Sequence, residues 1–87
     1  MSPEEMKKVQ QQVAIVVGLL NGLDIEAAVD LMERVGRQAK AADPLVWARA
    51  KASHERMLKM MRAAMTFQRT VGAVRKDIAE VPKLILS

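Results

Sequence analysis

The chain contains no cysteine, three prolines, four glycines and only two aromatic residues among its 87 positions. Without cysteine it can form no disulfide framework, no thiolate metal site and no thiol redox centre. The shortage of glycine, proline and aromatic residues excludes a β-sandwich or a β-barrel, because these folds need many turns and many aromatic or β-branched strand residues. The longest apolar run, residues 13–20, is far shorter than the roughly 20 residues that a membrane span needs.

The chain contains enough apolar residues to form a core, since 51% of its residues are hydrophobic. This apolar fraction excludes a disordered protein. Its length allows a single helical domain, spanning 1–87. No export signal is expected, because Glu4 and Glu5 precede Lys7 and Lys8 and no small-residue cleavage site follows the apolar run. A cytoplasmic location is the default for such a chain.

Apolar periodicity and capping residues predict an all-α fold with three helices, at about 3–20, 24–41 and 44–81. Ser2, Asp24 and Asp43 stand at the predicted helix starts, where their side chains can accept hydrogen bonds from free backbone N–H groups. The pair Asn21-Gly22 is expected to end the first helix in left-handed backbone. Both turns are short, so consecutive helices are predicted to form antiparallel hairpins.

The third predicted helix is long and coiled-coil-like. Its apolar residues recur at alternating intervals of four and three over five heptads, and nothing interrupts the pattern before Pro82. At ~1.5 Å per residue this helix is roughly 55 Å long, whereas a compact chain of this size has a radius of gyration of about 12 Å. Only Ser53 is polar in this row, which consists of Val46, Ala50, Ser53, Met57, Met60, Ala64, Phe67, Val71, Val74, Ile78 and Val81.

The second helix is expected to fold back along the first half of the third, which leaves the distal part of this apolar row, from Ala64 to Val81, uncovered. An exposed apolar stripe is typical of a protein interface, so we predict a homo-oligomer, a dimer or higher. In the alternative, the helix breaks near Gly72 and its end folds back over a monomeric core. The predicted interface residues are Ala64, Phe67, Val71, Val74, Ile78 and Val81.

Positive charge is concentrated in the second half of the chain. Residues 1–46 carry five basic and seven acidic side chains, whereas residues 47–87 carry nine basic and three acidic ones. A one-sided basic stripe attracts polyanions through their phosphates. In the alternative interpretation, the stripe is a solvated face partly neutralised by Glu26, Asp30 and Glu33. The candidate nucleic-acid-binding residues are Arg49, Arg56, Lys59, Arg62, Arg69 and Lys76.

Other chemistry is weakly indicated. The segment from Val13 to Gly36 has the outline of a helix-turn-helix, but its second helix begins with an acid and small side chains, which do not suit base readout. His54 is the only histidine, so it has no catalytic partners of a familiar kind, and the acidic residues have no metal-ligand spacing. We therefore expect no enzymatic activity, no cofactor and no metal.

Two functions remain open from the sequence. The first is a small non-enzymatic DNA-binding protein that self-associates through its third helix and contacts phosphates, a regulator or assembly factor of bacterial, plasmid or phage type. The second is a helical adaptor or assembly protein that binds another protein through the apolar stripe at 64–81 and uses its charge for solubility. Neither function involves a membrane.

Overall fold

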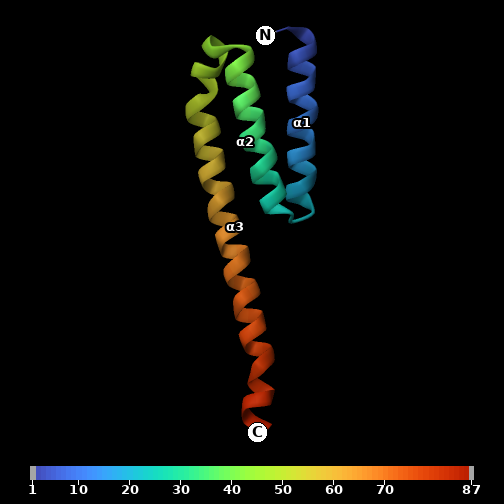
Figure 1. The fold of residues 1–87 in the computed structure, drawn as a ribbon, viewed down its shortest axis with the longest axis vertical. Coiled ribbons are helices and arrows are strands. Elements are labelled where there is room, and N and C mark those ends of the chain that lie inside the picture. Colours follow the sequence, from blue (N-terminus) through green and yellow to red (C-terminus); the bar gives the residue numbers. More distant parts are fainter. Residues whose placement is uncertain (1, 87) are drawn as a thin grey trace.

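The computed structural model describes residues 2–86 and contains three α-helices, α1 (Pro3–Asn21), α2 (Ile25–Ala42) and α3 (Pro44–Leu86). The predicted all-α class, the order of three helices and the long third helix are confirmed. Figure 1 shows α2 between α1 and α3, and α3 extending far beyond the other two helices. The molecule measures 65 × 21 × 15 Å, and its radius of gyration of 18.4 Å exceeds the value of about 12 Å for a compact chain of this length.

All three helices begin at the predicted capping residues. The Glu5 N–H donates to Ser2 Oγ at 3.2 Å, the Ala27 N–H to Asp24 Oδ1 at 3.3 Å, and the Val46 N–H to Asp43 Oδ1 at 3.2 Å. Each bond satisfies one of the N–H groups that a helix start leaves without an intrahelical partner. These caps fix the two short connections and hence the antiparallel order of the helices.

The turn between α1 and α2 differs from the expectation in one residue. Gly22 has a φ of −83°, and the left-handed residue is Leu23, with a φ of 59°. The Leu23 N–H donates to Leu20 O at 3.0 Å and the Asp24 N–H to Leu19 O at 2.9 Å, which is the Schellman pattern. The motif places its left-handed position one residue after Gly22, so a leucine occupies the site that usually holds glycine.

The third helix is longer than predicted. It continues without a break through Gly72, which contradicts the alternative of a chain folded back at that point, and past Pro82 to Leu86. Proline lacks an N–H group and leaves the carbonyl of Ile78 without its helical donor. That loss of one bond lies within the last two turns, where the remaining residues still close helical bonds of their own, so the helix does not end there.

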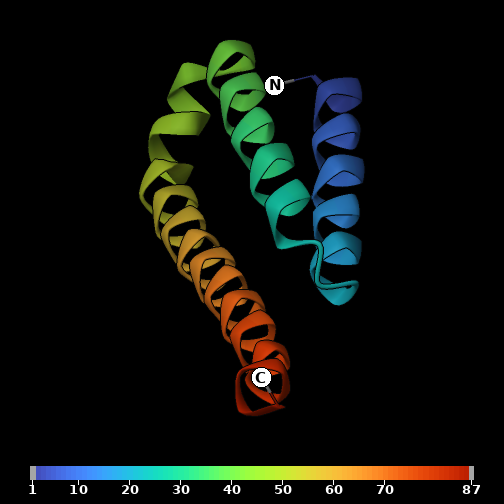
Figure 2. The same ribbon diagram turned by 60° about the horizontal axis from the view of Figure 1, so that its bottom comes forward.

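The core lies along α2. Its Ala28, Val29 and Met32 pack with Val16 of α1 and Leu58 of α3. Over the described residues, α1 and α3 each pack on α2 but have no Cα atoms within 8 Å of one another. The hairpins therefore form a single flat layer, and in the turned view of Figure 2 the distal half of α3 has no helix beside it.

Candidate functional site

A long and largely exposed apolar surface runs along α3, on the row from Val46 to Val81 that the sequence identifies; we call this row the α3 stripe. Five of the six predicted interface residues are exposed, with Phe67 at 70% and Ile78 at 64% of their full accessible surface, and only Val71 is half-buried. No helix of residues 2–86 lies against the helix beyond Val71, since every residue from Gly72 to Leu86 is exposed. Apart from Val71, the predicted interface residues are thus exposed within the described part of the chain.

The first half of the α3 stripe is also uncovered, which corrects one expectation. The second helix does fold back along the first half of α3, but it packs on the adjacent row of α3, where Trp47, His54, Leu58 and Met61 are buried or half-buried. Met57 and Met60 of the stripe remain exposed. The adjacent row carries larger side chains, whereas the first half of the stripe includes the small Ala50 and Ser53. Packing on the adjacent row therefore buries more apolar area.

An apolar groove borders the stripe on the open face of the layer. It runs between α1 and α3 with α2 as its floor, and its lining contains almost no polar surface. Side chains of α1 and α3 form its two walls. The groove stays open between them because these two helices do not touch each other. We call it the α1–α3 groove; it is lined by Val13, Val16, Val17, Leu20, Met32, Met57, Met60 and Met61.

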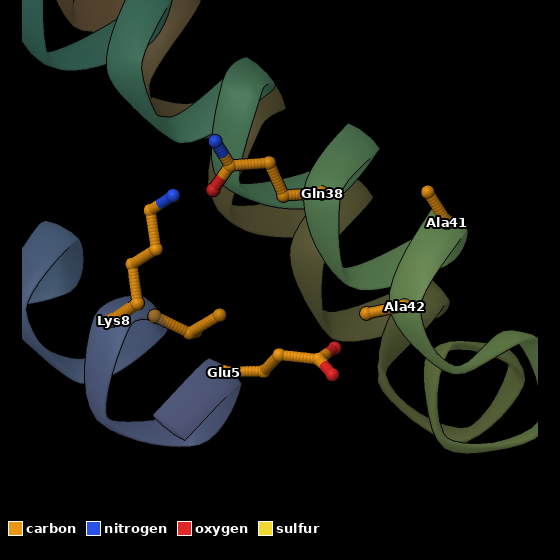
Figure 3. A pocket seen from close by; sticks show the side chains of 6 residues that line it. Glu5, Lys8, Gln38, Ala41 and Ala42 are labelled. Carbon is orange, nitrogen blue, oxygen red and sulfur yellow. The ribbon is translucent and has the colours of Figure 1, made fainter. Parts of the chain in front are cut away.

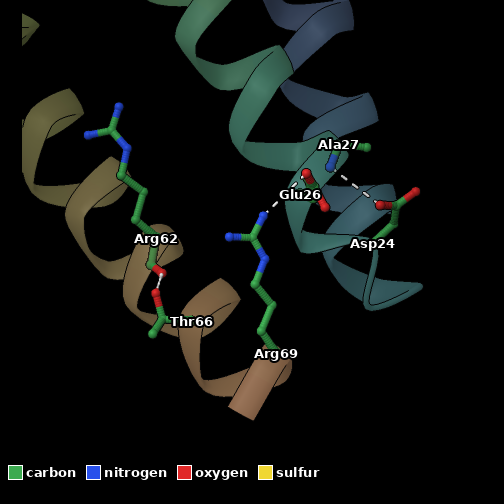
Figure 4. Close-up of polar contacts among 6 residues, drawn as sticks. All are labelled: Asp24, Glu26, Ala27, Arg62, Thr66 and Arg69. Atoms are coloured by element: carbon green, nitrogen blue, oxygen red, sulfur yellow. Dashed lines mark hydrogen bonds and ion pairs between the residues drawn. The ribbon is translucent and has the colours of Figure 1, made fainter. Parts of the chain in front are cut away.

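The opposite face of the layer carries ion pairs between α2 and α3. Arg62 donates to Glu33 Oε1 at 2.7 Å and Arg69 to Glu26 Oε1 at 3.3 Å. Figure 4 shows the Arg69 side chain reaching across to Glu26, next to the Asp24 cap. The two arginines are seven residues apart on α3 and the two glutamates are seven residues apart on α2. Both ion pairs therefore belong to the same antiparallel register of the two helices. Two of the six candidate phosphate contacts therefore already face carboxylates.

The other four candidate phosphate contacts form no ion pair among residues 2–86. Arg49, Arg56 and Lys59 lie exposed on the side of α3 away from α2, and Arg56 donates only to Ser53 Oγ, at 3.3 Å on the same helix. Lys76 is exposed on the distal half of α3. We call the row of Arg49, Arg56 and Lys59 the basic edge. The basic edge and the paired arginines Arg62 and Arg69 lie on different faces of α3.

His54 is a structural residue of the α2–α3 contact. It is 8% exposed, its Nε2 lies 2.8 Å from the carbonyl oxygen of Met32, and its ring meets Trp47 edge-on with centroids 4.9 Å apart. A carbonyl oxygen only accepts, so Nε2 carries the proton. The sequence placed His54 on a half-buried position without identifying this bond, and its spacing of seven from Trp47 was the signal that both share a face.

A second hollow lies between the start of α1 and the end of α2. Figure 3 shows Glu5, Lys8 and Gln38 around it, with Ala41 and Ala42 on the α2 side. All five residues are exposed. No group of three or more His, Cys, Asp or Glu side chains within the described part of the chain could hold a metal ion. The hollow thus offers solvated side chains and no converging ligands.

None of the three helices, over the residues described, combines the length and the apolarity needed to cross a membrane. Comparison of the chain with protein-family models, curated proteins and solved structures finds no match. Two surfaces of the molecule are candidates for its function: the apolar α3 stripe with the α1–α3 groove, and the basic edge.

Proposed function

We propose that the chain is a non-enzymatic helical assembly protein that acts by binding protein helices through the α3 stripe. The observation that carries this proposal is the long row of residues from Val46 to Val81 on one face of α3, which are apolar except for Ser53 and exposed except for the half-buried Val71. Monomeric proteins rarely expose a contiguous apolar patch of this extent, and such patches serve as protein interfaces. Charged residues of α3 lie off the stripe and keep the chain soluble.

Photo-crosslinking tests the proposal whatever the partner is. A photoreactive phenylalanine derivative placed at Phe67, in cells that produce the protein, is expected to give an adduct of defined mass with a second protein chain. The same derivative at Ala73, which is exposed on the other side of α3, serves as the matched control and is expected to give none. Equal adduct formation at both positions, or none at either, would contradict the proposal.

The basic edge supports a second candidate function, contact with nucleic-acid phosphates. Its Arg49, Arg56 and Lys59 have no carboxylate partners among residues 2–86 and lie on the same side of α3. Phosphate contacts carry little sequence information, so affinity for unrelated duplexes would be similar. Two copies with three contacts each would give a slope of log affinity against log salt of about −5.

The variant Arg49→Glu with Arg56→Glu tests this second candidate. It is expected to abolish retention on duplex DNA at low salt, because it reverses two of the three charges of the basic edge. Lys7→Glu with Lys8→Glu makes the same change of net charge on α1 and is expected to retain binding. If both variants bind as well as the unmodified chain, nucleic-acid binding by the basic edge is excluded.

A further inference from the structure

We infer that the α1–α3 groove is the docking site for the distal half of α3 from a second copy of this chain, which lies antiparallel and completes a four-helix bundle. The inference rests on the proposed function and specifies its partner and geometry. Residues 72–86 of the partner, together with the neighbouring turn, are the segment that enters the groove. By symmetry each copy gives and receives one such segment, so the dimer contains two bundles.

The direction of the helices favours this arrangement. Within one chain α1 and α3 run the same way and α2 runs opposite to both. A helix seated between α1 and α3 therefore has antiparallel neighbours on both sides only if it runs opposite to α3. An antiparallel copy of α3 meets this condition, and every adjacent pair in the resulting bundle is antiparallel, as in up-down-up-down four-helix bundles.

The length of the uncovered segment also fits. A helix can enter a groove between two helices only if no other helix of its own chain is packed on it. In α3 this holds for the part beyond Val71, because α2 packs on the part before that residue. Those 15 residues from Gly72 to Leu86 span about 22 Å, close to the roughly 28 Å of α1. The chain cannot fill its own groove, since α3 continues unbroken through Gly72.

The spacing of the stripe defines a register. Residues of the α3 stripe follow intervals of four and three, and two antiparallel copies match stripe to stripe when the numbers of paired residues add to 138. The two-fold axis then passes between Phe67 and Val71, beside the start of α2, and the partner's bare segment lies along the groove. The pairs are Met57 with the partner's Val81, Met60 with the partner's Ile78, Ala64 with the partner's Val74, and Phe67 with the partner's Val71.

The chemistry of the surfaces agrees with an apolar helix as the occupant. Between Val9 and Leu23 the chain has no charged residue, and the α3 stripe has none either. Lys76 and Lys83 of the distal half lie seven residues apart, on the side of α3 opposite the stripe, so they stay in water when the stripe is buried. The residues that the stripe brings together in the dimer are therefore uncharged, as is typical of the core of a protein interface.

The accessible surface of the monomer is larger than that of a compact monomer of the same mass. It exposes 6735 Å², whereas a compact monomer of 9.6 kDa exposes about 5,100 Å². Removing this excess from two copies would bury about 3,300 Å² in total, which lies in the range of obligate homodimers. Transient contacts bury less than half of that area.

Engineered cysteines test the register cleanly, because the natural chain has none. The double variant Met60→Cys/Ile78→Cys is expected to form a covalent dimer under a mild oxidant. The single variant Ile78→Cys is expected to stay unlinked, because antiparallel packing separates the two copies of this position by about 27 Å along the helix. Ala52→Cys/Ala73→Cys, on the far side of α3, is the control and is expected to stay unlinked. All the replaced residues are exposed in the monomer, so the fold does not depend on them.

Sedimentation equilibrium across the micromolar range gives the mass, which is expected to be twice the 9.6 kDa of one chain. Rapid linkage of Ile78→Cys alone would overturn the inference in favour of a parallel dimer, and the proposed function would stand. A monomer that still crosslinks at Phe67 to a different protein would likewise overturn the inference alone. A monomer without any adduct at Phe67 would remove both.

Discussion

Gly36 of α2 and His54 of α3 are packed so closely that a side chain on Gly36 has no room. A Cβ built on this glycine would lie 2.5 Å from Cε1 and 2.7 Å from Nε2 of the imidazole, and 3.2 Å from Trp47. The ring cannot withdraw without losing its bond to the Met32 carbonyl. The close approach of α2 and α3, and with it the choice of the α3 face that is buried, depends on this glycine.

Gly36→Ala is therefore expected to lower the free energy of unfolding by up to about 2 kcal/mol. Alanine contributes about 1 kcal/mol through its higher helix propensity, but overpacking against the fixed imidazole costs about 1–3 kcal/mol. Urea denaturation followed by circular dichroism measures the difference.

Gly18→Ala is the matched control for this experiment. Gly18 is also inside a helix, yet its Cβ would meet no atom within 4 Å. We expect this variant to raise the free energy of unfolding by about 0.5–1 kcal/mol. If both alanine variants were stabilising, the packing of His54 against Gly36 would be wrong.

Asp43 caps the start of α3, where its Oδ1 accepts a hydrogen bond from the Val46 N–H at 3.2 Å. Asp43→Ala is expected to lower the free energy of unfolding by about 1 kcal/mol, and Asp43→Asn by less, because asparagine also accepts this bond. Thermal unfolding of the three proteins at one concentration checks the order. Equal stability of all three would show that the cap contributes nothing to the fold.

The sequence predicted the three helices because their signals are local: capping residues, apolar periodicity and two short turns. It identified the α3 stripe, but the face of α3 that α2 buries depends on a contact between residues far apart in the chain. The sequence does not reveal that a glycine is required at position 36, since nothing local shows that His54 and Trp47 occupy the space beside it. The sequence predicted only that acidic residues of the second helix would partly neutralise the basic face of the third. It could not pair Glu33 with Arg62, because this pairing depends on the register between the two helices.

Leu23 occupies the left-handed position of the α1–α2 turn, with a φ of 59° and 67% of its surface exposed. A side chain in this conformation costs about 1–2 kcal/mol that glycine does not. Leu23→Gly is expected to raise the free energy of unfolding of the monomer by about 1 kcal/mol, measured by urea denaturation in the dilute range. A loss of stability would show that the leucine side chain contributes more through contacts than its backbone conformation costs.

The carboxylates of α2 limit the positive charge that α3 presents. Glu26→Gln with Glu33→Gln removes the partners of Arg69 and Arg62, while amides of the same size remain. These ion pairs are solvent-exposed, so their loss costs the fold only about 0–1 kcal/mol each. If the second candidate function holds, the variant is expected to bind duplex DNA more tightly, and the slope of log affinity against log salt is expected to steepen by about 0.9 for each arginine that gains a phosphate.

Glu4→Gln with Asp30→Asn is the control for this charge change, because neither residue forms an ion pair with α3 within the described chain. A general effect of net charge would raise affinity equally in both variants, whereas release of Arg62 and Arg69 raises it in the first alone and makes the slope steeper only there. Equal slopes would place any phosphate contacts on the basic edge and leave the two arginines as links between α2 and α3. Absence of binding in all three proteins at low salt would exclude the nucleic-acid function and leave assembly through the α3 stripe as the remaining proposal.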